Sequence, residues 1–360
     1  MTTATTAPYG SWKSPITPDL IVAKSIGLGQ VALDASIAEG DFGVYWIESR
    51  PAEAGRNALV HWHDGVAEEA VPAPFSVRTR VHEYGGGACL VHNGTIYFSN
   101  FQDQRLFRIS GSNEPVPITP DVNARLRYAD AVMDVKHNRL ICVREVHMLD
   151  GREAVNTLVS INCEGDEAGG RVLVAGNDFF ASPRLRPDGA QLAWLAWNHP
   201  NMPWDGTELW VADVNDDGAL ANPQRIAGGV SESIFQPEWS PDGVLHFVSD
   251  RTGWWNLYRW REGQVEALYP MDAEFGQPQW VFRQSVYAFL GPTQIICAFT
   301  KHGKEQLAFL NTESGELREI NSPYTDIGGV SARGRRVFFN AGSPTEFGAV
   351  VLFDVDTGAF

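Results

Sequence analysis

The sequence has few cysteines and lacks any apolar run of about 18 residues, the length needed to cross a bilayer. Its four cysteines, Cys89, Cys142, Cys163 and Cys297, lie far apart. Three of them fall in or beside apolar runs, which favours buried free thiols over disulfides or a metal site. The N-terminus also lacks the cationic start and apolar segment of a secretory signal. We therefore expect a cytoplasmic protein without a membrane partner.

Positive charge is scarce as well. The 360 residues include 28 Lys and Arg against 44 Asp and Glu, which gives a net charge of −16. The sequence pI is about 5.0. The basic residues are scattered singly and form no stripe, so a polyanion would be repelled. Nucleic acid is therefore not an expected partner.

Long amphipathic helical patterns are missing, and short apolar runs bounded by Gly, Pro, Asn and Asp take their place. This pattern is typical of an all-β protein. Seven similar runs recur at spacings of 43 to 52 residues, centred on Leu59, Leu106, Leu158, Leu209, Leu257, Leu307 and Val350. Each has a second strand-like run before it, and most have a further strand on either side. Four antiparallel strands repeated about every 45 residues indicate a blade of a β-propeller.

The repeat predicts an all-β, seven-bladed β-propeller of four-stranded antiparallel blades. A segment of residues 1–30 precedes a propeller of residues 31–360. The predicted blades cover residues 31–72, 85–119, 128–176, 181–229, 235–270, 276–320 and 326–360. The last blade has no evident fourth strand, so either the "LIVAK" segment at residues 20–24 completes it or the natural polypeptide continues.

Three short motifs resemble ligand sites but lack the setting that such sites need. "GLGQVA" (Gly27–Ala32) fits a dinucleotide fingerprint, yet a strand and a turn are expected after it instead of a helix. "DVNDDG" (Asp213–Gly218) matches half of a calcium loop, but Gln224 stands where a bidentate Glu is required. "HWH" places His61 and His63 on one face of a strand without a third zinc ligand nearby. We expect no cofactor and no metal.

No catalytic machinery is visible. A glycine-x-serine-x-glycine elbow is missing from the sequence, and no Ser/His/Asp set can be assigned. A propeller enzyme that acts in its central channel would need clustered carboxylates or metal ligands on the innermost strands, and the sequence pattern shows none. Enzymatic activity of the chain by itself is therefore not predicted.

Unusual loops gather on one face of the predicted propeller. With strands named A to D outwards, the B–C loops and the D-to-A connections share a face. That face receives "NHPNMPWDGT", "SDRTGWWN" and "RTRVHEYGGG", which are rich in aromatic, charged and histidine residues. Stiff aromatic side chains lose little entropy on binding a partner. The alternative is that Trp204 and Trp254 only cap the packing of their blades.

Four segments carry a resemblance to a known family: "PYGSWKSPIT", "RVHEYGGGA", the stretch from Ser182 to Ala212, and the stretch from Phe235 to Tyr258. They resemble the N-terminal propeller of prolyl oligopeptidase-family serine peptidases, in the acylaminoacyl-peptidase and dipeptidyl-aminopeptidase-like branch. The resemblance implies a C-terminal α/β-hydrolase domain that carries the Ser, Asp and His. This sequence contains no such domain, so no catalytic residue can be transferred to it.

The resemblance also implies a substrate-binding role for the loop-rich face, because some family members bind the charged end of a substrate with propeller residues. By position in the motifs, the candidates are Glu83 and Tyr84, followed by Arg80, His199, Asn201 and Trp204. Glu83 could pair with a peptide amino group beside an aromatic wall. The alternative is that "HEYGGG" is only a structural lead into a strand.

Two functions follow as hypotheses. In the first, the chain is the non-catalytic propeller of a serine oligopeptidase or exopeptidase, which gates access of short peptides, positions them and docks the hydrolase domain. In the second, it is a stand-alone propeller that serves as a protein-interaction scaffold. The aromatic-rich face would be exposed in the isolated chain, so we also expect self-association.

Overall fold

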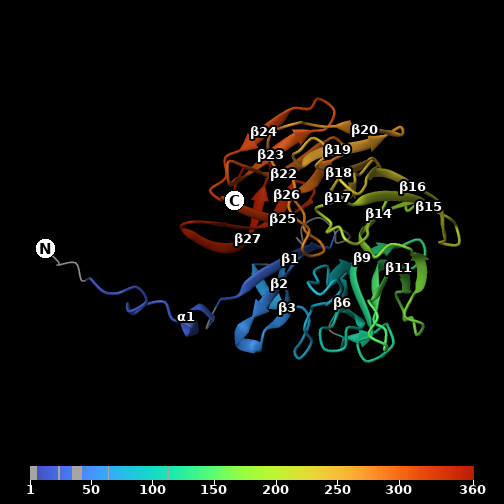
Figure 1. Cartoon of the computed structure of the whole chain (residues 1–360), viewed down its shortest axis with the longest axis horizontal. Coiled ribbons are helices and arrows are strands. Elements are labelled where there is room, and N and C mark those ends of the chain that lie inside the picture. Colours follow the sequence, from blue (N-terminus) through green and yellow to red (C-terminus); the bar gives the residue numbers. More distant parts are fainter. Residues whose placement is uncertain (1–5, 23–24, 35–42, 64, 112) are drawn as a thin grey trace.

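The structure is a computed structural model that describes residues 6–22, 25–34, 43–63, 65–111 and 113–360. It confirms the seven-bladed β-propeller: seven antiparallel sheets follow one another around a central axis, in chain order (Figure 1). Six sheets have four strands, and the last has three in the described part of the chain. Helix is limited to α1 (Pro18–Val22) and the short 3₁₀ turn η1 (Pro51–Glu53) among the described residues.

The strands of each blade follow the chain from the axis outwards. Blade 1 consists of β1 (Gly27–Leu33), β2 (Val44–Arg50), β3 (Arg56–His63) and β4 (Val66–Glu69). Blade 2 consists of β5 (Cys89–His92), β6 (Thr95–Ser99), β7 (Leu106–Ser110) and β8 (Val116–Pro117). Blade 3 consists of β9 (Leu126–Asp134), β10 (Arg139–Val146), β11 (Val155–Asn162) and β12 (Arg171–Val174).

Blades 4 to 7 have the same arrangement. They consist of β13 (Phe179–Leu185), β14 (Gln191–Trp197), β15 (Glu208–Val214), β16 (Leu220–Gly228); β17 (Ile234–Trp239), β18 (Leu245–Ser249), β19 (Asn256–Arg261), β20 (Gln264–Ala267); β21 (Tyr287–Gly291), β22 (Gln294–Lys301), β23 (Lys304–Asn311), β24 (Leu317–Ile320); and β25 (Asp326–Arg333), β26 (Arg336–Ser343), β27 (Glu346–Asp354).

One alternative for the last blade is wrong. The "LIVAK" segment does not add a strand to blade 7, because its first three residues belong to α1 and the next two lie outside the described residues. Its Leu20 and Ile21 side chains are exposed. The segment that contains α1 extends away from the body of the propeller (Figure 1).

The ring closes where blade 1 meets blade 7. Strand β1 contacts β25, β26 and β27, although the two blades remain separate sheets. The junction is an apolar cluster that includes Val31, Trp46 and Phe338. The Asn340 amide also donates a hydrogen bond across it to the Gly29 carbonyl, at 2.8 Å. No strand is shared between the two blades in the described part of the chain.

The turns and short motifs agree with the sequence interpretation. Asn93 and Gly94 have φ values of 50° and 68°, as a tight A–B hairpin requires. "DVNDDG" is the turn between β15 and β16, and "GLGQVA" is strand β1, paired with β2. His61 and His63 share a face of β3, and the described residues hold no group of three metal-ligating side chains.

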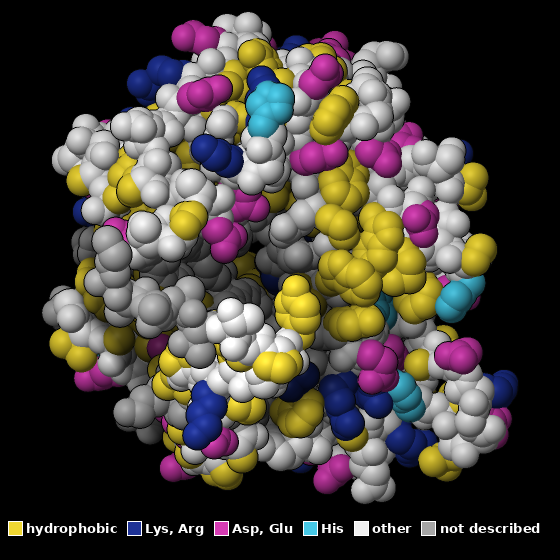
Figure 2. Space-filling view, turned by 60° about the vertical axis from the view of Figure 1, so that its left-hand side comes forward, with side chains coloured by type: hydrophobic (Ala, Val, Ile, Leu, Met, Phe, Trp, Pro, Cys, Tyr) yellow, Lys and Arg dark blue, Asp and Glu magenta, His cyan; other side chains and the backbone are white. Residues whose placement is uncertain are grey.

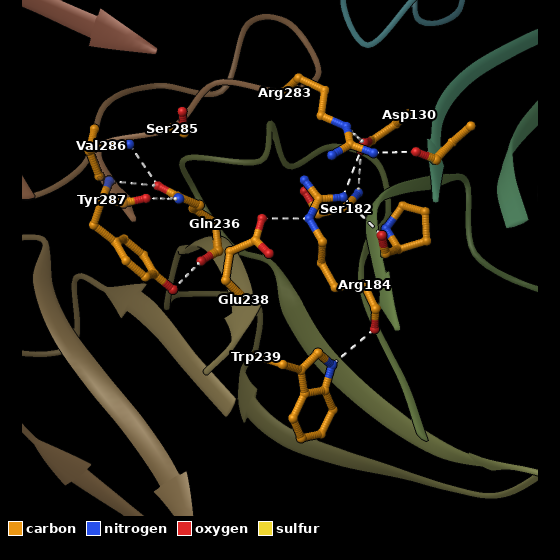
Figure 3. Close-up of polar contacts among 12 residues, drawn as sticks. Asp130, Ser182, Arg184, Gln236, Glu238, Trp239, Arg283, Ser285, Val286 and Tyr287 are labelled. Atoms are coloured by element: carbon orange, nitrogen blue, oxygen red, sulfur yellow. Dashed lines mark hydrogen bonds and ion pairs between the residues drawn. The ribbon is translucent and has the colours of Figure 1, made fainter. Parts of the chain in front are cut away.

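The innermost strands carry β-bulges whose polar residues are buried against the neighbouring blades. Asp130, Ser182 and Gln236 occupy the bulges of β9, β13 and β17, with φ values of 55°, 51° and 46°. A bulge of this kind breaks the alternation of the strand and redirects the side chain. The Gln236 amide oxygen accepts hydrogen bonds from the backbone of Val286 and Tyr287, at 2.7 and 3.3 Å (Figure 3).

An ionic network near these bulges links blades 3, 4 and 5 with the connection between blades 5 and 6 (Figure 3). Asp130 is fully buried and lies 3.1 Å from Arg184 Nη1 and 2.7 Å from Arg283 Nε. Arg184 also donates to Glu238 Oε1, at 2.6 Å. Burial alone would raise the pKa of Asp130, but the two guanidinium groups and the Ser182 amide lower it below its ordinary value. Each carboxylate of the network is therefore paired with arginine: Asp130 with Arg184 and Arg283, and Glu238 with Arg184.

The cysteines match the expectation of free thiols. All four are unpaired and buried. Burial raises the pKa of Cys89, Cys142 and Cys297 to about 12, which keeps these thiols protonated and unreactive. No helix among the described residues is both long enough and apolar enough to span a bilayer.

A buried histidine on β18 makes the fold sensitive to acid. Burial lowers the pKa of His246 to about 4 from its ordinary 6.5. The unfolded chain thus binds more protons than the folded chain between these values, so the stability contributed by a neutral His246 is complete above pH 6.5 and is lost as the pH falls toward 4. At pH 5 the loss should amount to about 2 kcal/mol. In urea unfolding at pH 7.5 and 5, His246→Gln should lose correspondingly less stability than the parent.

A matched control is His302→Asn, which removes an exposed histidine at a turn with a positive φ. If the parent and His246→Gln lose the same stability between the two pH values, His246 does not contribute to acid sensitivity.

Candidate functional site

Two long connections meet over the mouth of the channel on the loop-rich face. They join blade 1 to blade 2 (residues 70–88) and blade 5 to blade 6 (residues 268–286). The Phe282 amide donates a hydrogen bond to the Gly85 carbonyl, at 3.0 Å, and Gly86 forms a parallel bridge with Phe282. A side chain at Gly86 would lie 2.5 Å from the Phe282 carbonyl, so this contact requires glycine. We call this pair of connections the clasp.

The glycines of "HEYGGG" are therefore structural, whereas the three residues before them line a cavity. His82 and Glu83 have φ values of 53° and 63°, a left-handed conformation that non-glycine residues adopt at a cost of about 1–2 kcal/mol each. Such strain is concentrated at functional sites. Here it turns His82, Glu83 and Tyr84 toward a cavity beside the clasp.

The cavity has a volume of about 460 Å³ and lies between the clasp and the loops of blades 3 and 4. Its inner part is aromatic. The His82 ring contacts Phe179, Trp197 and Phe282, with centroid distances of 5.1, 5.5 and 4.9 Å. Phe179 stacks on Trp197 at 5.3 Å. Phe179 and Trp197 are paired on adjacent strands of blade 4, and the fold brings His82 and Phe282 to them from the two distant connections of the clasp. We call these four side chains the floor of the pocket.

The outer wall is also aromatic. Trp280 of the clasp lies 4.5 Å from Trp204 and 5.3 Å from Tyr84, measured between ring centroids. Tyr84 and Trp280 are exposed, as are Met202 and Trp254 on the neighbouring loops. Figure 2 shows hydrophobic side chains gathered in a contiguous patch, with acidic and histidine side chains at its edge. The aromatic residues therefore form a surface wall as well as blade packing.

Hydrogen bonds fix the loop of residues 198–207 against its neighbours. Asp178 accepts hydrogen bonds from the His199 backbone at 2.9 Å, and its own amide donates to Asn198 at 2.7 Å. The Asn201 side chain donates to the Val230 carbonyl, at 2.8 Å. The Met202 amide donates to Asp205, at 2.9 Å. The loop is thus preformed, and ordering it on contact with a ligand would cost little entropy.

The rim carries mostly negative charge. The pocket lining contains one arginine, Arg152, and four carboxylates, those of Glu83, Glu145, Glu153 and Asp178. Arg127 lies just behind Glu83, with its Nη1 atom 3.0 Å from Glu83 Oε1 and 3.4 Å from Glu145 Oε2. The Glu83 side chain is 74% exposed, so it can accept a second partner from solvent or a ligand.

Five of the six candidates from the sequence line this pocket: Glu83, Tyr84, His199, Asn201 and Trp204. Arg80 does not belong to the lining, and its guanidinium lies over the Phe101 ring at 5.5 Å from the centroid. The sequence interpretation missed the pocket residues His82, Asn156, Phe179, Trp280 and Phe282. "QPQWVF" at residues 277–282 lies in a D-to-A connection, so its position on the loop-rich face could have indicated Trp280.

A larger hollow of about 990 Å³ lies at the channel mouth between blades 1 and 7. Its lining includes glycines, the charged residues Arg283 and Asp326, and several Ser, Asn and Gln side chains. Among the described residues it has no cluster of packed aromatic rings such as the one that lines the smaller cavity. The aromatic pocket is therefore the better candidate site.

The fold and this pocket define the class: a seven-bladed propeller with an aromatic, acid-rimmed pocket on its loop-rich face. The chain is 37% identical to a puromycin-hydrolyzing peptidase of Mycobacterium tuberculosis, with a TM-score of 0.88 over 99% of this chain and 56% of that one. A puromycin hydrolase gives 37% identity, a TM-score of 0.89, and coverage of 98% and 56%. The chain belongs to the propeller domains of the prolyl oligopeptidase family of peptidases.

More distant structures agree on the fold alone. Prolyl oligopeptidase B of Galerina marginata is 9% identical, with a TM-score of 0.66 over 93% of this chain and 50% of that chain. An oligogalacturonate lyase is 13% identical, with a TM-score of 0.66 over 91% and 90% of the two chains. No protein-family model and no curated protein matches the chain. The chain spans about half the length of the peptidases that it resembles, 56% of each puromycin-hydrolysing one.

Proposed function

We propose that this chain is the non-catalytic propeller of a serine oligopeptidase or exopeptidase, and that its pocket binds the amino-terminal end of short peptides. The observation that carries the proposal is the pairing of an exposed carboxylate, Glu83, with an aromatic cavity of about 460 Å³. An ammonium group would pair with Glu83 while the first side chain enters the cavity. The likeness to puromycin-hydrolysing peptidases supports a hydrolase parent.

The exposed wall that includes Tyr84, Met202 and Trp280 would then serve as the docking surface for an α/β-hydrolase domain of the same polypeptide. Docking there would close the pocket and restrict access to short peptides. Left uncovered, the same surface favours self-association. The four buried free thiols are consistent with a reducing, cytoplasmic location.

The proposal is tested by binding of Phe-Ala-Ala and acetyl-Phe-Ala-Ala to the chain, measured by calorimetry. The free amine should bind at least about tenfold more tightly, because a charge-assisted hydrogen bond contributes about 1.5–3 kcal/mol. Glu83→Gln keeps the shape but removes the charge, so it should abolish this preference. Glu319→Gln, which removes an exposed carboxylate of blade 6, is the control and should retain it.

Equal binding of the two peptides by the parent would contradict a site for the amino terminus. Turnover of either peptide by the purified chain would contradict a non-catalytic role.

A further inference from the structure

Two arginines of the clasp lie outside the pocket, in the stretch of residues 77–81. The side chains of this stretch alternate as in a strand. Val77, Thr79 and Val81 are at most 1% exposed, whereas Arg78 is exposed and Arg80 is half-buried. Because residues two apart in an extended chain share a side, the two guanidinium groups face the same way, outwards from the blade.

Both guanidinium groups contact one aromatic ring, that of Phe101 in the B–C loop of blade 2. The guanidinium carbons of Arg78 and Arg80 lie 4.9 and 5.5 Å from its centroid. The backbone joins the two segments: the Phe101 amide donates to the Ser76 carbonyl at 2.9 Å, and the Arg80 amide donates to Gln104 Oε1 at 2.8 Å. The ring attracts both cations, so these long side chains are held in place before any ligand binds.

No carboxylate of the described residues neutralises this pair of arginines. Neither side chain forms an ion pair or a hydrogen bond there, and the buried Nε atom of Arg80 has no partner. The loop that holds Phe101 contains one acid, Asp103, whose Oδ1 atom accepts hydrogen bonds from the Asn100 side chain at 3.0 Å and the Arg105 amide at 3.2 Å. The two guanidinium groups are therefore available to an external anion.

The charge and shape of the site favour a carboxylate. The planar fork of a guanidinium group matches the two oxygens of a carboxylate. The net charge of −16 on the whole chain disfavours a multiply charged anion more than a singly charged one. The neighbouring Arg127, which donates to the Arg80 carbonyl at 3.1 Å, is already paired with Glu83 and Glu145 and adds no free cation.

We propose that Arg78 and Arg80, held over Phe101, form a binding site for one carboxylate of a polypeptide that lies on the loop-rich face. The carboxylate belongs to an Asp or Glu side chain or to a C-terminus, and the same two guanidinium groups would hold either. The site goes beyond the function proposed above, because it uses neither Glu83 nor the amino group of a ligand.

The test uses N-acetylated peptides, which have no free amine for Glu83. Acetyl-Ala-Asp-Ala-amide carries a side-chain carboxylate, acetyl-Ala-Ala-Ala carries a C-terminal one, and acetyl-Ala-Ala-Ala-amide is neutral. Binding is followed by an NMR titration of the chain with isotopically labelled arginine, at about 20 mM salt. At least one carboxylate peptide should bind about tenfold more tightly than the neutral peptide, and the tighter of the two identifies the source of the carboxylate. The preference should shrink at about 0.5 M salt, because the site is open to solvent.

Arg78→Gln removes an exposed cation and should weaken binding of the carboxylate peptide about threefold without disturbing the fold. The double variant Arg78→Gln, Arg80→Gln should bind the carboxylate and neutral peptides within about twofold of each other. Arg318→Gln is the matched control. Arg318 is also exposed and lies over a phenylalanine ring, 4.9 Å from the centroid of Phe309, but it is a single guanidinium group. This variant should keep the full preference.

Equal binding of all three peptides by the parent would overturn the carboxylate site. A preference that survives in both arginine variants would overturn its assignment to Arg78 and Arg80. Tighter binding of inorganic phosphate than of either carboxylate peptide would overturn the class of ligand. None of these outcomes involves Glu83, so the function proposed above is tested separately by the peptides with a free amine.

Discussion

Asp130→Ala should lower the free energy of unfolding by about 3–5 kcal/mol, the usual cost of removing one partner from a buried ion pair. Asp130 is fully buried, and its carboxylate pairs with Arg184 of blade 4 and with Arg283 of the clasp. Without it, Arg283 would have to remain as an uncompensated charge at the centre of the ring. Urea unfolding at neutral pH, followed by tryptophan fluorescence, measures the change.

Two further variants show whether the buried charge is the cause. Adding Arg283→Met to Asp130→Ala removes the stranded cation and should recover part of the lost stability. Asp216→Ala removes a fully exposed carboxylate that pairs with Lys136 at 2.8 Å, and it should leave the unfolding midpoint unchanged. A stability of Asp130→Ala within about 1 kcal/mol of the parent would show that the network is not important for folding.

Gly86→Ala should strongly destabilise the clasp. The added methyl group would lie 2.5 Å from the carbonyl oxygen and 2.6 Å from the amide nitrogen of Phe282, and φ at this position is +86°. The left-handed backbone and the overpacking together should cost about 3 kcal/mol. Because the clasp positions Tyr84 and Trp280, binding of Phe-Ala-Ala should also weaken. Urea unfolding and calorimetry test the two effects.

Gly253→Ala is the control that distinguishes the cost of a left-handed backbone from the cost of the close contact at Gly86. Gly253 has a φ of +87°, and no heavy atom lies within 4 Å of a side chain built there. Gly253→Ala should therefore lower the free energy of unfolding by only about 1 kcal/mol, the cost of alanine in a left-handed backbone conformation. If the two alanine variants are equally stable, the close approach of the clasp is not what requires glycine at position 86.

The sequence predicted the propeller because each blade repeats the same order of strands and turns. It did not predict the ionic network, because its pairs join residues one blade apart: Arg184 lies 54 positions from both Asp130 and Glu238. Neither β13 nor β17, which carry Arg184 and Glu238, contains a cluster of charged residues by itself. The bulges at Asp130, Ser182 and Gln236 also interrupt the alternation that a strand pattern relies on.

For the candidate site, the loop residues were predictable and the floor was not. "HEYGGG" and "NHPNMPW" stand out because connections seldom hold so many rigid or aromatic residues, and both line the pocket. Phe179 and Trp197 pair with each other on β13 and β14 and look like ordinary core residues in the sequence. Only the packing of His82 against them shows that they border a cavity.

The junction between blades 1 and 7 gives the molecule an unusual topology for a ring. In the described part of the chain, apolar packing and the hydrogen bond from Asn340 to Gly29 join its two ends, without a strand shared between the sheets. The ring is therefore closed by contact between its first and last blades and not by the pairing of strands, in the described residues. Each of its seven sheets is built from a single continuous stretch of chain, so the circle could be parted at this one place without breaking any sheet.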